Sequence, residues 1–282
     1  MVDYIIEIFY LTCAMKTKYI SNKTKLMGSD PVNDIVSVPR PIVAMAKEFP
    51  SGHLIPFHQH NRSQLLYASS GVMTVKTNKG VWVVPPLRAV WIPALTRHQI
   101  NVSGQLSMRT LYIDSTYFSS PSEGCCVISV SPLLKELILH AVNMPRLYPL
   151  MGPEERLLRV LMDQIQDMSI TPLELQIPED TRLKKIYKRL SNNPGDNRTL
   201  EDWGKVAGAT GRTLARRFRL ETGLSFGQWR QQIRILEALR RLGMKEPVTT
   251  VAIDLGYDSL SAFISMFKKA LGITPGQYFV DE

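Results

Sequence analysis

The sequence has little cysteine and little histidine, with three and five residues among 282. Cys13 and the adjacent pair Cys125 and Cys126 are too few for a disulfide framework and lack the Cys-x-x-Cys spacing of a zinc site. The apolar run near the N-terminus is interrupted by Glu7 and is too short to span a bilayer. These shortages indicate a cytoplasmic protein with no membrane partner.

Signatures of enzymes are also missing. The sequence contains no catalytic-triad motif, no phosphate-binding loop and no dinucleotide fingerprint. We therefore expect a protein that is not an enzyme and that has no cofactor.

Acidic residues are scarce in the last third of the chain. Residues 182–282 hold 18 Lys and Arg against 10 Asp and Glu, whereas residues 1–181 hold 16 against 15. Nearly all of the net charge of +9 therefore lies in the last third. A basic domain joined to a neutral one indicates a module for binding a polyanion, although a bias toward solubility would give the same count.

The hydrophobic pattern changes along the chain. Short β-rich runs separated by Gly and Pro fill residues 35–128, and leucines at helical spacing follow from Ser131. The predicted fold class is α+β with two domains, a β-barrel or jelly roll followed by an all-α domain. The expected boundaries are 1–34 for a poorly ordered extension, 35–128 for the barrel, 129–170 for a helical connector, 171–181 for a linker and 182–282 for the helical domain. The connector either forms a dimer surface or only covers the barrel.

One helical pattern occurs twice in the last third, at Thr199–Trp229 and Val248–Tyr278. Each copy predicts a short helix, a turn with glycine and a second helix, followed by a capping box. In the first copy Arg212, Arg216 and Arg219 fall within about 60° on the outward face of the second helix. Three arginines on one exposed face repel one another, and guanidinium groups suit guanine edges and phosphates. A double helix-turn-helix that binds double-stranded DNA is therefore expected.

The second copy reads Val251-Ala-x-x-x-Gly-Tyr-x-Ser-x-Ser-x-Phe-x-x-x-Phe-Lys-Lys-x-x-Gly-x-Thr-Pro-x-x-Tyr278. This pattern resembles the signature of the AraC/XylS family of transcriptional regulators, and the resemblance covers roughly Leu183–Phe279. Gly204 stands where the family usually has Ala, which weakens a helix by about 1 kcal/mol. The second copy also lacks the Arg often found near Ser265. The resemblance implies DNA-facing positions at Arg212, Ala215, Arg216, Arg219, Ser261, Ile264, Ser265 and Lys268.

The histidines of the barrel segment follow a recognisable spacing. Gly52-x5-His58-x-His60-x3-Gln64-x6-Gly71 resembles the first cupin motif, and Pro93-x-Leu95-x-x-His98 resembles the second, although Gln64 replaces Glu and Leu95 replaces Gly. His58, His60, Gln64 and His98 are our candidates for an effector-binding site without metal. A divalent metal at the same four residues is the alternative, because imidazole and oxygen ligands suit transition metals.

We therefore interpret the sequence as that of a sequence-specific transcriptional regulator, an activator or a repressor, that responds to a small-molecule effector. A homodimer is expected, and RNA polymerase is a further candidate partner. Two other classes remain open. A cupin metalloenzyme with an accessory DNA-binding domain would hold stoichiometric metal, and an RNA-binding or chromosome-compacting protein would bind without regard to sequence.

Overall fold

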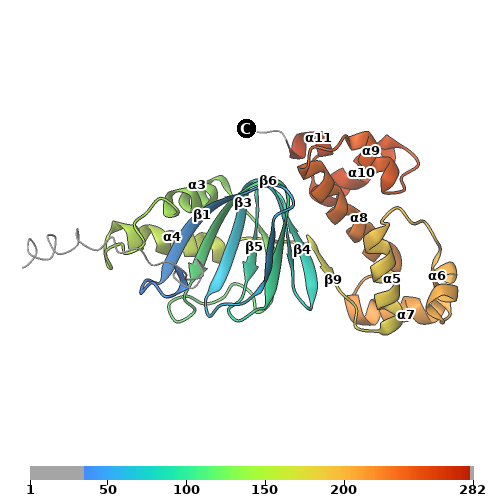
Figure 1. Ribbon diagram of the computed structural model, residues 1–282, viewed down its shortest axis with the longest axis horizontal. Coiled ribbons are helices and arrows are strands. Elements are labelled where there is room, and N and C mark those ends of the chain that lie inside the picture. Colours follow the sequence, from blue (N-terminus) through green and yellow to red (C-terminus); the bar gives the residue numbers. More distant parts are fainter. Residues whose placement is uncertain (1–34, 280–282) are drawn as a thin grey trace, which may run out of the picture. The chain divides into compact units, whose positions relative to one another are not determined.

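The computed structural model describes residues 35–279 (Figure 1). The extension expected over residues 1–34 lies outside the described residues. Within them, nine strands form one antiparallel sheet, which agrees with the predicted barrel or jelly roll. The strands are β1 (Ile42–Phe49), β2 (Leu54–His58), β3 (Ser63–Lys76), β4 (Gly80–Val84), β5 (Arg88–Ile92), β6 (His98–Ile113), β7 (Cys126–Ser129), β8 (Ile170–Thr171) and β9 (Glu174–Gln176).

The long strands β3 and β6 form the centre of the sheet. They pair over most of their length, and the register shifts twice between Ala68 and Val72. Gly71 lies at this bulge with φ +76°, where an added Cβ would be 2.3 Å from the carbonyl oxygen of Gln105. The sequence pattern placed a strand boundary at Gly71, but the strand continues through it. Glycine here permits a bend and a close backbone approach instead of ending the strand.

The predicted linker at residues 171–181 is partly strand, which corrects the sequence-based boundary. β8 pairs with β7, and β9 pairs with β4 from Gly80↔Gln176 to Trp82↔Glu174. The indole Nε1 of Trp82 also donates to Oε2 of Glu174 at 2.9 Å. Two prolines suggested an open connection, but Leu173 and Leu175 are buried and hold the segment on the sheet.

Two helices, α3 (Pro132–Ala141) and α4 (Pro153–Gln166), lie against one side of the sheet (Figure 1). Their buried side chains include Leu134, Ile138 and Leu161, which join a cluster with sheet residues such as Trp91. The leucines of the connector therefore do cover the barrel. Leu133 and Val160 face outward instead, with 52% and 46% of their surface exposed.

The helical domain contains seven helices in the described residues. The helices are α5 (Thr181–Asn192), α6 (Leu200–Ala207), α7 (Gly211–Thr222), α8 (Phe226–Gly243), α9 (Val248–Asp254), α10 (Leu260–Leu271) and α11 (Pro275–Tyr278). α8 runs between the group α5 to α7 and the group α9 to α11 (Figure 1).

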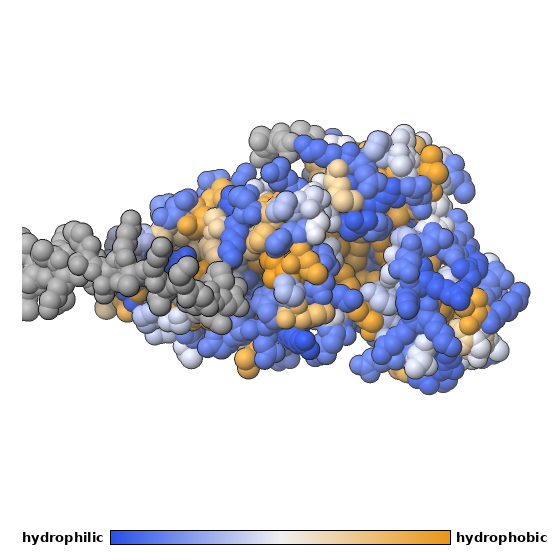
Figure 2. All heavy atoms as spheres, viewed as in Figure 1, coloured by the Kyte–Doolittle hydropathy of each residue, from blue (hydrophilic) through white to orange (hydrophobic). Residues whose placement is uncertain are grey.

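The surface over α5, α6 and α7 is mostly hydrophilic on the face shown in Figure 2. No helix in residues 35–279 is long and apolar enough to cross a membrane.

Candidate DNA-binding surface and effector site

The first helix-turn-helix unit, α6 and α7, begins and ends where local chemistry predicts. Thr199 and Asp202 form a reciprocal capping box at the start of α6, and Gly208 ends the helix with φ +71°. Thr210 caps α7 by accepting from the backbone N–H of Thr213, and Gly223 ends it with φ +70°. These caps fix which residues of α7 lie on its outward face.

The outward face of α7 carries the three predicted arginines. Leu214 and Phe218 are fully buried on the opposite face, whereas Arg212, Arg216 and Arg219 are all exposed. Among residues 35–279 none of these three guanidinium groups makes a hydrogen bond or an ion pair. Ala215, the fourth predicted contact of this helix, is half-buried beside them. The helix therefore presents three cations that no part of the described chain neutralises.

Arg217 belongs to the same helix but not to this face. It lies 3.6 Å from Oδ2 of Asp180, the residue that caps α5 and also pairs with Arg182. Hydrogen bonds from Arg182 hold the pKa of the Asp180 carboxyl well below its usual range. The helical period left Arg217 out of the outward face, because its angle on the helix sets it apart from the other three arginines, but the sequence did not show its partner Asp180.

The second unit, α9 and α10, presents a nearly uncharged face. Ser261, Ser265 and Lys268 are exposed on α10, and Phe263 and Phe267 are fully buried behind them. Ile264, which is also predicted to face DNA, is half-buried like Ala215, and part of its side chain packs against the core of the domain. Ser259 caps α10 and Gly272 ends it, so the scaffold of the first unit is repeated.

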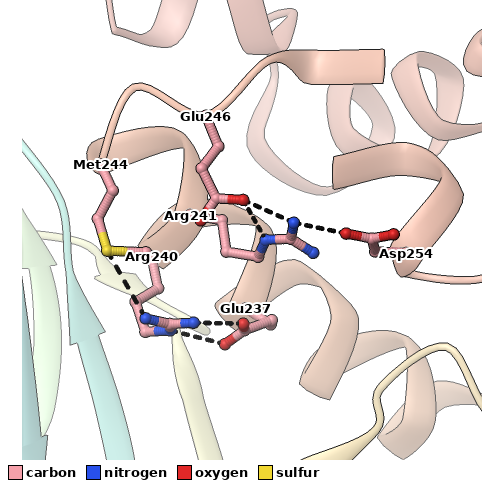
Figure 3. A network of polar contacts seen from close by, with 6 residues as sticks. All are labelled: Glu237, Arg240, Arg241, Met244, Glu246 and Asp254. Carbon is pink, nitrogen blue, oxygen red and sulfur yellow. Dashed lines mark hydrogen bonds and ion pairs between the residues drawn. The ribbon is translucent and has the colours of Figure 1, made fainter. Parts of the chain in front are cut away.

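A charged network fastens the second unit to α8 (Figure 3). Arg241, near the end of α8, donates from Nε to Glu246 at 2.7 Å and from Nη2 to Asp254 at 2.6 Å. Glu246 lies in the turn after α8 and Asp254 is the last residue of α9. The side chain of Arg241 is largely buried, whereas the carboxylates of Glu246 and Asp254 are partly exposed, so the network ties the turn and the helix to α8 at the surface of the domain.

The loop between α5 and α6 is a second connection, which the sequence analysis missed. Arg234 of α8 donates to the carbonyl oxygen of Pro194 and to Oδ1 of Asn197, and Asn197 donates to the carbonyl oxygen of Gly256. An added Cβ at Gly195 would lie 2.3 Å from the carbonyl oxygen of Asp254. A Pro-Gly dipeptide is typical of a turn, but nothing in the sequence pattern shows that this turn packs on the second unit.

Gly204 has a structural reason to be glycine. An added Cβ would lie 2.4 Å from the carbonyl oxygen of Ala209, in the turn that follows α6. The backbone N–H of Ala209 donates to the carbonyl oxygen of Gly204 at 3.0 Å, which draws the turn onto the helix. The expected gain of about 1 kcal/mol from Ala applies to an isolated helix, whereas here a methyl group has no room.

The four candidate effector residues of the barrel lie together. His58 and His98 are directly opposite each other on β2 and β6, with ring centroids 4.3 Å apart. His60, between β2 and β3, has its ring centroid 5.4 Å from that of His98. Nε2 of His60 is 3.1 Å from Oε1 of Gln64, and Gln64 donates from Nε2 to Thr110 at 3.0 Å.

This cluster is mostly buried. His60, Gln64 and His98 are buried, and His58 is partly exposed at one side. Burial lowers the pKa of His98 to about 4 and also lowers the pKa of His60. Both rings are therefore neutral near pH 7, and they offer lone pairs instead of positive charge.

Leu95 explains why glycine is usual at its position in the second cupin motif. Its backbone has φ +62°, in the left-handed region that costs an L-residue about 1–2 kcal/mol. The backbone N–H of Leu95 donates to the carbonyl oxygen of His60 at 2.8 Å. The left-handed turn thereby positions the backbone of His60, a candidate effector-binding residue, and the side chain of Leu95 is exposed.

Comparisons with known proteins match both domains of the chain. A model described as a helix-turn-helix domain matches residues 203–280, and one described as an AraC-like ligand binding domain matches residues 46–138. NimR, an HTH-type transcriptional regulator of Escherichia coli, is 37% identical over 79% of this chain and 81% of its own. RipA, an HTH-type transcriptional regulator of Corynebacterium glutamicum, is 29% identical over 36% of this chain and 31% of its own.

Among solved structures, ToxT of Vibrio cholerae aligns with 85% of this chain and 97% of its own at 13% identity and a TM-score of 0.37. That score is too low for a comparison of details.

A duplicated helix-turn-helix joined to a ligand-binding barrel defines an effector-responsive, DNA-binding transcriptional regulator. The chain belongs to the AraC/XylS family, as the extent of its identity with NimR shows.

Proposed function

We propose that this regulator reads its DNA site mainly through Arg212, Arg216 and Arg219 of α7. The three unneutralised guanidinium groups on one exposed helical face carry this proposal. Arg can bond to guanine O6 and N7 or to a phosphate through two parallel hydrogen bonds, and each bonded base contributes about 1–3 kcal/mol of discrimination. α10 adds Lys268 and two serine hydroxyls, which suit hydrogen bonds to the sugar-phosphate backbone of DNA.

The barrel residues His58, His60, Gln64 and His98 form the proposed effector site. Three of the four are buried, and Nε2 of the buried His98 has no hydrogen-bond partner within the described chain, so a bound ligand would satisfy this atom. The partly exposed His58 marks the side from which a ligand reaches them.

A homodimer completes the proposal. The outward side chains of Leu133 on α3 and Val160 on α4 supply an apolar surface on the helices that cover the barrel. Two chains would place four helix-turn-helix units on DNA and raise affinity through avidity. Light scattering of the purified chain is expected to give the mass of a dimer, and a monomer at all concentrations would contradict this part.

The DNA proposal is tested with a site selected by the wild-type protein from a random pool of duplexes. Arg216→Ala is expected to weaken binding to that site by about 1–3 kcal/mol if Arg216 reads a base. The affinity is measured by gel-shift titration at fixed salt. Arg217→Ala is the matched control, because it removes one charge from the same helix on a different face. Equal affinities of wild type and Arg216→Ala would reject the role.

A general nucleic-acid binder would give a different result in a competition experiment. Unlabelled competitor DNA of random sequence should displace the selected duplex poorly. Competition that is independent of sequence would favour a general binder over a regulator.

A further inference from the structure

Helix α5 carries the highest net positive charge of the helices in residues 35–279. Residues 181–192 hold five Lys and Arg and no Asp or Glu. Four of these cations are exposed and form what we call the basic face of α5: Lys184, Lys185, Lys188 and Arg189. The buried side of the helix is apolar and consists of Leu183, Ile186 and Leu190. At about 100° per residue the four cations span an arc of roughly 140° opposite these three, so they point away from the core of the domain.

Nothing in the described chain neutralises the basic face. None of its four side chains makes a hydrogen bond or an ion pair within residues 35–279, whereas Arg182 of the same helix is bonded to the N-cap Asp180. Like charges four residues apart repel each other on a helix surface, and the basic face contains two such pairs. The pairs are Lys184 with Lys188 and Lys185 with Arg189. A bound polyanion would remove this repulsion.

The composition of the basic face fits phosphate groups better than it fits a protein. Three of its four residues are Lys, which is depleted at protein–protein interfaces, where aromatic and Arg anchors dominate. The helix has no exposed apolar side chain, and its one aromatic residue, Tyr187, is half-buried against Trp229. Lys binds phosphate as a point charge and needs no apolar surroundings to do so.

The start of α5 lies on the side of α7 that does not carry the outward arginines. Oε2 of Glu221 on α7 accepts from the backbone N–H groups of Glu179 and Asp180 at 2.8 and 3.0 Å, and Arg217 is 3.6 Å from Asp180. Helical geometry places Glu221 and Arg217 about 150° around α7 from the middle of the arginine face. DNA held by that face and the helix α5 are therefore on different sides of α7.

We propose that the basic face of α5 is a second, sequence-independent DNA-binding surface, which holds the phosphate backbone of another DNA segment. The inference goes beyond the reading of a selected site, and it rests on the proposed function only in placing that site on the other side of α7. Duplex DNA carries a negative charge about every 1.7 Å along its axis, so four neighbouring cations release counterions when they bind it. One chain then holds two DNA segments at once.

The test uses the full-length chain, saturated with the selected duplex, which is biotinylated and fixed to a sensor surface. Saturation occupies α7 in every chain, including both chains of a dimer. A fluorescent duplex of random sequence is then passed over the surface at fixed salt. The wild type is expected to retain this second duplex while the first one stays bound, and retention should fall as salt rises.

The decisive variant replaces all four cations of the basic face with Gln, which keeps good helix propensity. Its affinity for the second duplex should fall by about tenfold or more, and the slope of log affinity against log salt should fall by about 3. Its affinity for the selected duplex should stay within about twofold of the wild type. A variant with Arg at the three Lys positions should retain the second duplex, because the charge is kept.

A matched control removes four exposed cations from the barrel domain, so the net charge changes equally. The control carries Lys76→Gln, Lys79→Gln, Arg146→Gln and Arg156→Gln. It should bind the second duplex as the wild type does. Circular dichroism establishes that each variant is folded.

Four results would overturn the proposal. They are no retention of the second duplex by the wild type, equal retention by the Gln variant of α5, an equal loss in the barrel control, or a loss of the selected duplex from the α5 variant. Retention of purified RNA polymerase by the basic face, without retention of the random duplex, would identify an acidic protein partner instead. The selected duplex is defined by wild-type binding, so this assay remains valid even where Arg216→Ala leaves the gel shift unchanged.

Discussion

The two helix-turn-helix units have the same scaffold and different outward faces. Inward positions repeat as large apolar residues, Leu214 and Phe218 in α7 against Phe263 and Phe267 in α10. The caps of α7 and α10 repeat as well, with Thr210 and Gly223 in the first and Ser259 and Gly272 in the second, because a side-chain acceptor stabilises a helix start and a left-handed end favours glycine. No such requirement acts on the exposed positions, where α7 has three Arg and α10 has two Ser and one Lys. On the function proposed above, we expect a division of labour in which α7 supplies most of the DNA-binding energy.

The turns of the two units differ in a related way. Ala209 N–H donates to the carbonyl oxygen of Gly204, and Tyr257 N–H donates to that of Ala252. Counted from the left-handed glycine to the next N-cap, the second turn (Gly256 to Ser259) is one residue longer than the first (Gly208 to Thr210), and Ala252 is buried beside it. The shorter first turn lies so close to α6 that position 204 has no space for a methyl group. Glycine and a short turn therefore go together in the first unit.

The largest expected effect comes from removing the charged face of α7. Replacing Arg212, Arg216 and Arg219 together with Ala should weaken binding to the selected duplex by about 3 kcal/mol or more. Replacing Ser261, Ser265 and Lys268 with Ala should cost about 1 kcal/mol or less, because only one charge is lost. Fluorescence anisotropy at fixed salt measures both. Equal losses for the two triple variants would contradict the division of labour.

A smaller effect is expected on the stability of the first unit. Gly204→Ala should destabilise it by about 1–3 kcal/mol, because overpacking against the Ala209 carbonyl outweighs the gain in helix propensity. Faster amide hydrogen exchange confined to α6 and α7 is the expected signal. Gly227→Ala in α8 is the control, since its added Cβ meets nothing within 4 Å and should be neutral or stabilising. Slower exchange in Gly204→Ala would show that the turn adapts at no cost.

The smallest effect concerns the single cation of α10. Lys268→Ala should lower the slope of log affinity against log salt by about one if the ammonium group touches a phosphate. Lys269→Ala removes the neighbouring charge, which is rotated by about 100° around the helix, and should change the slope less. Gel-shift titrations at several salt concentrations give the slopes. An unchanged slope in Lys268→Ala would remove this contact from the second unit.

The sequence predicted most of the scaffold of the helical domain. The caps at Thr199, Thr210 and Ser225 and the left-handed glycines are local, so spacing alone located them. Strand boundaries were less predictable. Gly71 looked like a break because the sequence did not show that β6 runs close beside it, and the prolines of residues 171–181 concealed two short strands.

For the candidate sites, the identities of the residues came from the sequence. Helical period set the outward face of α7, and motif spacing selected His58, His60, Gln64 and His98. Tertiary structure decided which side chains of the two recognition helices already have partners within the described chain. Arg217 is paired with Asp180 and Ile264 is packed on the core, and neither fact follows from spacing. Likewise, only the pairing of distant strands brings His58 and His98 together, with Nδ1 of each ring held by a backbone carbonyl. Local chemistry is encoded residue by residue, but the partners and burial of a side chain depend on segments far away in the chain.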